Sequence, residues 1–200
     1  DRAANAGADA TDRENPYLLF FGRLSAEKGV DTLLRAFDAA LPSLPQNMRL
    51  VVVGDGPDAA DFKTLASSLG CAARIEFAGY QTGGALQAYV ERASLAISSS
   101  RWRENMPYSI VEAFAAGTPV IGTDIGGIPE LVDEWKTGFV CEPGGVQSMA
   151  DAISRGTSAF LDRSAYSMLQ RNCRSYVMEN CSREKFMNDL VNLYKESIDG

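Results

Sequence analysis

Short apolar segments alternate with amphipathic ones along most of this chain, and that alternation limits the fold more than any other feature of the sequence. Between the apolar segments, hydrophobic residues recur at helical spacing, as Leu33, Leu34 and Phe37 do. Buried strands joined by helical crossovers form a parallel sheet that is covered by helices on both faces. We therefore predict an α/β fold with a doubly wound parallel sheet of six strands. The segments that supply these strands are 17–22 (YLLFFG), 49–54 (RLVVVG), 74–79 (RIEFAG), 94–99 (SLAISS), 119–123 (PVIGT) and 138–142 (GFVCE).

Both ends of the chain depart from this pattern. Residues 1–15 are polar, rich in alanine and without periodicity, and the first residue is not Met, so we predict a flexible linker with further chain before it. The remainder, residues 16–200, is expected to form one domain. After Val146 the pattern is purely helical, which predicts extra C-terminal helices. One face of the last of them is marked by Phe186, Leu190, Leu193 and Tyr194.

Charge and composition exclude several classes of partner. The net charge is −7 and no basic run is present, which argues against nucleic acid or an anionic membrane as the main partner, because both require clustered Lys and Arg. No apolar stretch approaches the roughly 20 residues that span a bilayer, and no signal peptide is visible. The four cysteines lack metal-binding spacing, so we predict free thiols in a soluble cytoplasmic protein.

The loop after the first predicted strand, GRLSAEKG, carries two cations between two glycines. Ligands of doubly wound sheets gather at the carboxyl ends of the strands, so Gly22, Arg23 and Lys28 are candidate diphosphate ligands. Arg offers a forked donor and Lys a point charge. The alternative is that both cations are solvated, or that Lys28 pairs with Glu27 or Asp31.

The next two loops carry weaker signals. Gly54, Gly56 and Ala59 have the spacing of a dinucleotide-binding fingerprint. This turn follows the second strand instead of the first, however, and a tight turn before a helix explains its glycines without a cofactor. Tyr80 follows the third strand, where its ring can stack on a nucleobase or cap the core.

The segment ENMPYSIVE places Glu104 and Glu112 eight positions apart, with Pro107 between them. The first acid falls in a loop and the second lies about one turn inside the following helix, so both can face the crevice at the helix N-terminus. Unpaired amides and the helix dipole bind anions there, and carboxylates accept hydrogen bonds from sugar hydroxyls. The alternatives are a solvated loop acid and an ordinary helix surface acid.

The residues around these acids have simpler expected roles. Trp102 is expected to pack, and Arg101 and Arg103 to be solvated or paired with Glu104. In the loop after the fifth strand, consecutive glycines at positions 126 and 127 permit close backbone approach to a ligand.

Together these motifs resemble the C-terminal, donor-binding half of glycosyltransferase family 4, a group of retaining nucleotide-sugar transferases with two Rossmann-like halves in the GT-B fold. The resemblance covers roughly residues 17–145, in order, and one departure is ENMP, which stands where many members have E-x-F-G. It rests on FFGRLSAEKGVDTLLRAF, VVVGDGP, IEFAGY, SSSRWRENMPYSIVEAFAAGTPVIGTDIGGIPELV and TGFVCEPG.

The resemblance implies roles for the residues named above. Arg23 and Lys28 would hold the donor diphosphate and neutralise it as it leaves, and Glu104 would contact the hydroxyls of the donor sugar, so these three are the predicted catalytic residues. Glu112 would bind the ribose hydroxyls. The other predicted donor-binding residues are Asn105, Met106, Pro107, Tyr108, Ser109 and Ile110 around the helix start, and Gly22, Gly54 and Tyr80 at the first three strand ends.

The resemblance thus predicts the donor-binding half of a retaining enzyme that moves a hexose-type sugar from a UDP- or GDP-sugar to a polysaccharide, a lipid or a small glycoside. No metal or other cofactor is expected, since the chain has no D-x-D sequence, and without histidine it has no imidazole general base. The acceptor would belong to a missing N-terminal half, which would also decide any contact with the inner membrane face, so the isolated domain is expected to be inactive. Two alternatives stay open: a GT-B nucleotide-sugar epimerase and a non-catalytic nucleotide-binding module.

Overall fold

The structure of this protein is a computed structural model, which describes residues 10–181, 185 and 187. Part of the predicted linker, residues 1–9, lies outside the described residues. The predicted apolar stripe of the last helix lies outside them as well: Phe186, Leu190, Leu193 and Tyr194.

The described end of the predicted linker is held against the domain. The backbone N–H of Asp12 donates to the carbonyl of Arg92 at 3.0 Å, and the Arg13 guanidinium donates to the carbonyl of Phe160, also at 3.0 Å. The packed domain therefore starts a few residues before the predicted boundary at residue 16.

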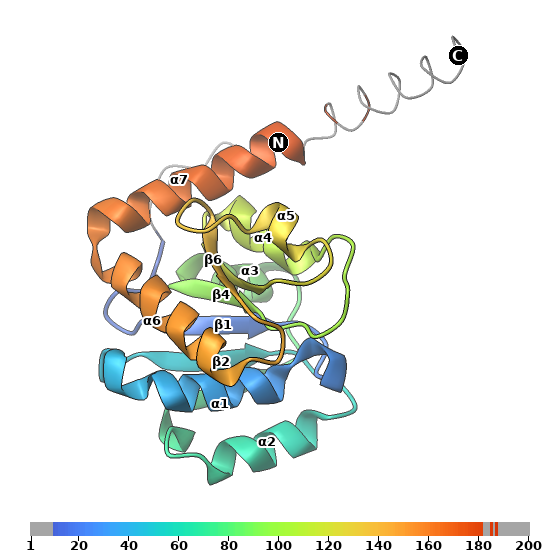
Figure 1. Ribbon diagram of the computed structural model, residues 1–200, viewed down its shortest axis with the longest axis vertical. Coiled ribbons are helices and arrows are strands. Elements are labelled where there is room, and N and C mark those ends of the chain that lie inside the picture. Colours follow the sequence, from blue (N-terminus) through green and yellow to red (C-terminus); the bar gives the residue numbers. More distant parts are fainter. Residues whose placement is uncertain (1–9, 182–184, 186, 188–200) are drawn as a thin grey trace.

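A sheet of six parallel strands runs through the middle of the molecule (Figure 1). Its strand order, β3-β2-β1-β4-β5-β6, confirms the predicted doubly wound, Rossmann-like sheet. The strands are β1 (Tyr17–Phe21), β2 (Arg49–Val53), β3 (Ile75–Gly79), β4 (Leu95–Ser98), β5 (Val120–Thr123) and β6 (Gly138–Cys141).

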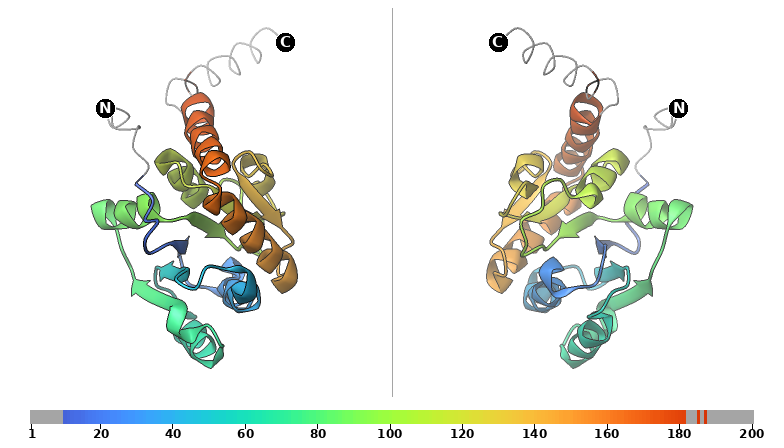
Figure 2. Two further views of the ribbon diagram at one scale, coloured as in Figure 1. Left: turned by 90° about the vertical axis from the view of Figure 1, so that its left-hand side faces the viewer. Right: turned by 90° about the vertical axis from the view of Figure 1, so that its right-hand side faces the viewer.

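Helices cover both faces of this sheet, as the two side views show (Figure 2). The short 3-10 helices η2 (Ala26–Lys28), η3 (Leu41–Ser43) and η4 (Ala72–Arg74) lie in the connections. The α-helices are α1 (Val30–Ala40), α2 (Ala59–Ser68), α3 (Gly83–Arg92), α4 (Tyr108–Ala116), α5 (Ile128–Leu131), α6 (Val146–Leu161) and α7 (Arg163–Asn180).

Alternation along the strands divides the core into two layers. Leu18 and Leu50 point to the face covered by α1, α2 and α6, whereas Leu19 and Val51 point to the face covered by α3, α4 and α5. This separation follows from the period of two along a strand. Helix α7 contributes side chains to both layers. Because both layers are apolar, the central strands read as continuous hydrophobic segments in the sequence.

Strand β3 is the exception to the predicted burial on both faces. It lies at the edge of the sheet and all of its residues are at least partly exposed. There the Glu76 carboxylate accepts a hydrogen bond from the Arg49 guanidinium at 2.8 Å. An edge strand has a neighbour on one side only, so a charged residue fits within it.

The strand order reverses beside β1, and the ligand crevice is expected at this point of the sheet. From β1 the chain moves to β2 and β3 on one side, and it then returns to form β4 on the other side of β1. The loops that follow β1 and β4 therefore diverge at the same edge of the sheet, and ligands of doubly wound sheets bind in that opening.

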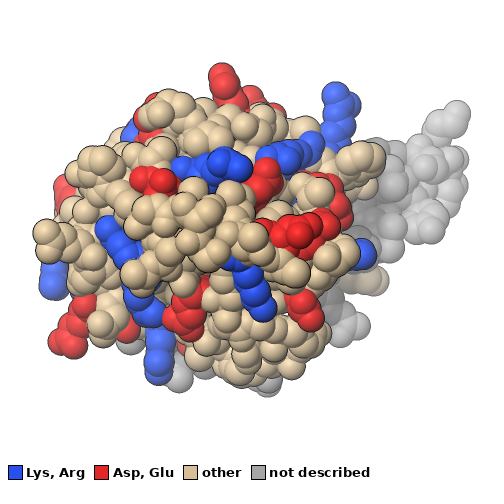
Figure 3. Space-filling model, turned by 90° about the horizontal axis from the view of Figure 1, so that it is seen from below, with Lys and Arg blue, Asp and Glu red and all other residues tan. Residues whose placement is uncertain are grey.

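Two further features of the folded chain are the distribution of charge on one face and the hydropathy of the helices. On the face seen from below, acidic and basic side chains are interspersed (Figure 3). Within the described part of the chain, no helix is both long and apolar enough to cross a membrane.

Candidate functional site

A cleft of about 280 Å³ opens at the carboxyl ends of β1 and β4, where the strand order reverses. Its walls come from the loop after β1 and from the segment between β4 and the start of α4. The structure thus brings two sequence-distant motifs to one place. The predicted site residues that line this cleft are Gly22, Arg23, Lys28, Glu104, Met106, Pro107, Tyr108 and Ser109.

Lys28 and Glu104 form an ion pair inside this cleft. The Lys28 ammonium lies 2.7 Å from Oε1 of Glu104, and the two side chains are only 30% and 19% exposed. The alternative in which Lys28 pairs with Glu27 or Asp31 is therefore wrong. Arg101, which the sequence predicts to be solvated or paired with Glu104, donates to Asp31 at 2.5 Å instead.

Hydrogen bonds across the strand reversal fix the backbone that carries Lys28. The Ser99 hydroxyl donates to the carbonyl of Lys28 at 2.7 Å, and the backbone N–H of Arg101 donates to the carbonyl of Glu27 at 2.8 Å. Gly29 has a φ of 66°, and a Cβ at this position would lie 2.1 Å from the Ser99 carbonyl oxygen. Only glycine permits this approach of the two loops.

The loop that carries Glu104 is held in a similar way by two glycines from the β5–α5 connection. The backbone N–H of Gly127 donates to the carbonyl of Glu104 at 2.7 Å. A Cβ at Gly127 would lie 2.0 Å from the Asn105 carbonyl oxygen, and one at Gly126 would lie 2.6 Å from that of Glu104. The sequence predicts that these glycines allow a ligand to approach the backbone closely, but in the structure it is the loop carrying Glu104 that lies against them.

Arg23 is exposed and lines the same cleft. Its guanidinium makes no hydrogen bond or ion pair with any residue that the structure describes. All five of its N–H donors are therefore open to a ligand, and a forked guanidinium suits a diphosphate.

Helix α4 begins beside these charges without a side-chain cap. Pro107 is the N-cap residue and provides no capping hydrogen bond, while Tyr108 and Ser109, the first helical residues, line the cleft. The first amides of a helix have no intrahelical acceptor, and the helix dipole adds positive potential there. This end of the cleft is suited to an anion.

Three predicted residues around α4 do not line this cleft. The side chain of Ile110 is buried, and its backbone N–H donates to the carbonyl of Pro107 at 3.0 Å, so this amide is engaged. Asn105 lies in a neighbouring cleft. Glu112 is exposed and lines neither of these two clefts, contrary to the expectation that both acids face one crevice. Glu112 lies on the same face of α4 as Tyr108 but one turn further from the helix start, and hence further from the cleft.

Gly54 and Tyr80 follow β2 and β3 and stay outside this cleft. A Cβ at Gly54 would lie 1.9 Å from the carbonyl oxygen of Gly22, so this glycine allows two loops to pack and needs no cofactor to explain it. Tyr80 is 74% exposed. It does not cap the core, and its stacking on a nucleobase stays a prediction.

Sequence reasoning missed several features of the site. Ser98 to Ser100 line the cleft, and their place at the carboxyl end of β4, which neighbours β1, is the signal that could have identified them. Trp102 was expected to pack but is 68% exposed. Trp102 belongs to neither of the two described core clusters.

Among the described residues, no group of three His, Cys, Asp or Glu side chains could hold a metal ion. All four cysteines are free, as predicted. Burial raises the pKa of Cys71 and of Cys141 to about 12, so neither thiol is ionised near neutral pH.

Comparisons with known proteins identify relatives of this chain in sequence and in fold. D-inositol 3-phosphate glycosyltransferase of Actinosynnema mirum is 37% identical over 147 residues, which are 69% of this chain and 35% of that protein. Sucrose-phosphate synthase of Thermosynechococcus elongatus is 26% identical with a TM-score of 0.79, over 96% of this chain and 49% of that one. HepE of Anabaena, solved with UDP, is 22% identical with a TM-score of 0.79, over 91% and 49% of the two chains.

These likenesses define the fold and the family. The two solved structures share the α/β fold of this chain over more than nine tenths of its length. The chain spans less than half the length of the curated relatives it matches. A family model described as "Glycosyl transferases group 1" matches residues 1–172, and the chain therefore belongs to this family.

Proposed function

We propose that this chain is the C-terminal, donor-binding half of a family 4 glycosyltransferase with the GT-B fold, and that its cleft binds a nucleoside diphosphate sugar. One observation carries the proposal: Arg23, Lys28, Glu104 and the start of α4 converge on one cleft at the reversal of strand order. A diphosphate needs cations and amides, and a sugar needs a hydroxyl acceptor. This cleft holds both kinds of group.

The residues divide between the two parts of the donor. Arg23, Lys28 and the first amides of α4 bind the diphosphate and stabilise its charge as it leaves, which is electrostatic catalysis by preorganised donors and requires no metal. The Glu104 carboxylate accepts hydrogen bonds from the sugar hydroxyls. Glu112 binds the ribose, and Tyr80 and Gly54 lie toward the base.

Related proteins narrow the donor class. HepE has been solved with UDP-glucose, and a relative 35% identical over 150 residues is named as a GDP-mannose-dependent mannosyltransferase of Mycobacterium tuberculosis. A UDP- or GDP-hexose donor is therefore the first choice for this chain.

The rest of the reaction belongs to chain beyond this domain. Transfer requires an acceptor held against the anomeric carbon, and the proposed partner is an N-terminal acceptor-binding half. Retention of configuration is proposed by resemblance to the family. The protein would act in the cytoplasm, with any contact to the inner membrane face made through that half.

Calorimetric titration of the 200-residue chain with UDP, GDP, UDP-glucose and GDP-mannose tests the proposal. We expect one nucleotide to bind, and Arg23→Ala to weaken binding by about 1.5–3 kcal/mol, because a hydrogen-bonded charge is lost. Arg103→Ala is the matched control, since Arg103 is also exposed and lines neither cleft. Absence of nucleotide binding, or equal losses in the two variants, would contradict the proposed site.

A further inference from the structure

A second cleft, of about 560 Å³, opens next to the first. Lys28, Glu104 and Met106 line both clefts and thus form a shared wall. The residues that belong to the second cleft alone are Glu27, Trp102 and Asn105. None of the roles assigned above to the donor uses Glu27 or Trp102.

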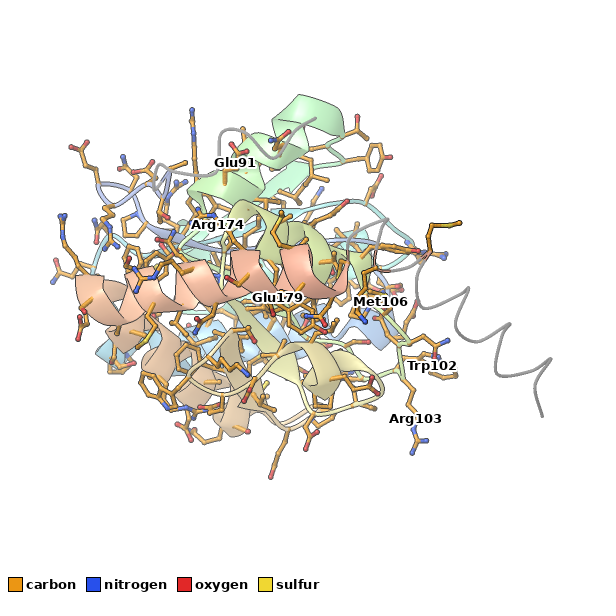
Figure 4. The ribbon with its side chains drawn as sticks, turned by 90° about the horizontal axis from the view of Figure 1, so that it is seen from above. Glu91, Trp102, Arg103, Met106, Arg174 and Glu179 are labelled. Carbon is orange, nitrogen blue, oxygen red and sulfur yellow. The ribbon has the colours of Figure 1, made fainter. Side chains whose placement is uncertain are left out.

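Trp102 presents an exposed indole from a fixed backbone. Its side chain is 68% exposed, and Met106 beside it is 47% exposed. The Ser100 hydroxyl, from a residue that is 2% exposed, bonds both the N–H and the carbonyl of Trp102 at 3.2 Å. Figure 4 shows Trp102 and Met106 projecting from the same loop, with Arg103 directed away from the body of the domain. Because Trp102 and Met106 both line the second cleft, their exposed side chains offer an apolar surface to a ligand bound there.

Polar groups of a defined kind border this indole. The Glu27 carboxylate accepts a hydrogen bond from the Ser25 hydroxyl at 2.6 Å, which fixes its position and lowers its pKa, so it is ionised at neutral pH. Asn105 adds a carboxamide, which both donates and accepts. The two carboxylates of the cleft outnumber its one cation, Lys28, which disfavours an anionic ligand.

An aromatic face bordered by carboxylate and amide groups matches the chemistry of a neutral sugar ring. The C–H face of a pyranose can lie on an indole, and its hydroxyls donate to carboxylates and exchange hydrogen bonds with a carboxamide. We propose that this second cleft supplies the part of the acceptor site that lies on this chain and binds the sugar ring of the acceptor, with Trp102 as the stacking platform and Glu27 and Asn105 as hydroxyl ligands, while the N-terminal half holds the rest of the acceptor. This inference rests on the proposed function, because it takes the first cleft as the donor site. Glu104 borders both clefts and would bring the two sugars side by side.

NMR titration of the 200-residue chain with neutral glycosides tests this proposal. The probes are the methyl α-D-pyranosides of glucose, mannose and galactose, and the readout is the indole N–H of Trp102. The chain has two tryptophans, so Trp135→Phe assigns the signals. Trp135 is also the matched control, because it is 52% exposed, packs edge-to-face on Phe139 and lines neither cleft.

We expect at least one glycoside to shift the Trp102 signal saturably, with millimolar affinity because a single ring offers few contacts. Trp102→Ala should weaken this binding about tenfold or more, Trp102→Phe should retain part of it, and Trp135→Phe should retain all of it. UDP and GDP are titrated in parallel. If a nucleotide binds but no glycoside shifts the Trp102 signal, the acceptor site is overturned while the donor site stands. If a glycoside shifts that signal and neither nucleotide binds, the donor assignment fails instead. A glycoside whose binding survives Trp102→Ala also overturns the proposal.

Discussion

The ammonium of Lys28 lies 2.7 Å from a carboxylate oxygen of Glu104, although 76 positions separate the two residues in the sequence. Each is the counter-charge of the other in a partly shielded site. A nucleotide sugar offers a replacement for both, because its diphosphate attracts the ammonium and its hydroxyls donate to the carboxylate. In the proposed function, the pair therefore connects diphosphate recognition to sugar recognition.

Glu104→Ala is expected to separate these two recognitions. Affinity for UDP or GDP should be retained or increase, since Lys28 loses a competing partner, whereas affinity for the matching nucleotide sugar should fall by about 1–3 kcal/mol as an ionised acceptor is lost. Calorimetry with both ligands measures the difference, and Glu130→Ala, at an exposed acid of α5 outside both clefts, is the control. Parallel losses for the two ligands would place Glu104 outside the sugar site and favour a plain nucleotide-binding module.

Lys28→Ala and Arg23→Ala are expected to agree in binding and differ in stability. Both should weaken nucleoside diphosphate binding by about 1.5–3 kcal/mol. Only Lys28→Ala removes an ion pair, so it alone should lower the free energy of unfolding, by at most about 1 kcal/mol because the pair is partly exposed. Urea denaturation of the two variants distinguishes them, and a larger loss of stability in Arg23→Ala would mean that Arg23 has a structural role.

Glu112→Gln tests the ribose assignment of a residue that lines neither cleft. If the carboxylate accepts hydrogen bonds from ribose hydroxyls, the variant should lose affinity for the normal nucleotide and lose little for its 2′,3′-dideoxy counterpart. The difference between the two ligands should therefore become smaller. Equal losses for both nucleotides would show that Glu112 acts through the structure of α4.

Gly127→Ala is expected to disturb the Glu104 loop. Its Cβ would lie 2.0 Å from the carbonyl oxygen of Asn105, so the backbone must shift, at an expected cost of about 1–3 kcal/mol for overpacking. Gly84→Ala, in α3, is the matched control, because its Cβ would meet nothing within 4 Å. That variant should be neutral or more stable by up to about 1 kcal/mol. Thermal unfolding of both variants gives the comparison, and equal behaviour would show that the β5–α5 glycines do not constrain the loop.

The buried thiols predict a loss of stability at high pH. Burial raises the pKa of Cys71 and of Cys141 from 9.0 to about 12. Because the folded-state pKa is raised, the protonated thiols contribute their full stabilisation below pH 9.0, the pKa of the unfolded state. This stabilisation is lost as the pH rises from 9 toward 12. Urea denaturation at about pH 8 and about pH 10 should therefore show a smaller free energy of unfolding at the higher pH. Cys71→Ala should reduce this difference, and an unchanged difference in that variant would contradict the assignment.

The sequence by itself determined the sheet, because burial on both faces of a parallel strand leaves a short apolar segment that is visible without any tertiary contact. Strand-end loops then follow from chain order, and this is why Arg23, Lys28 and Glu104 could be placed at one crevice in advance. Only the tertiary structure decided which charges meet. Lys28 has acids much closer in sequence, yet it pairs with Glu104, because bonds such as that from the Ser99 hydroxyl to the Lys28 carbonyl bring the two loops together. The exposure of Trp102 likewise depends on the path of the loop after β4, where the Ser100 hydroxyl bonds both the backbone of Trp102 and the carbonyl of Glu27, 73 positions away in the sequence.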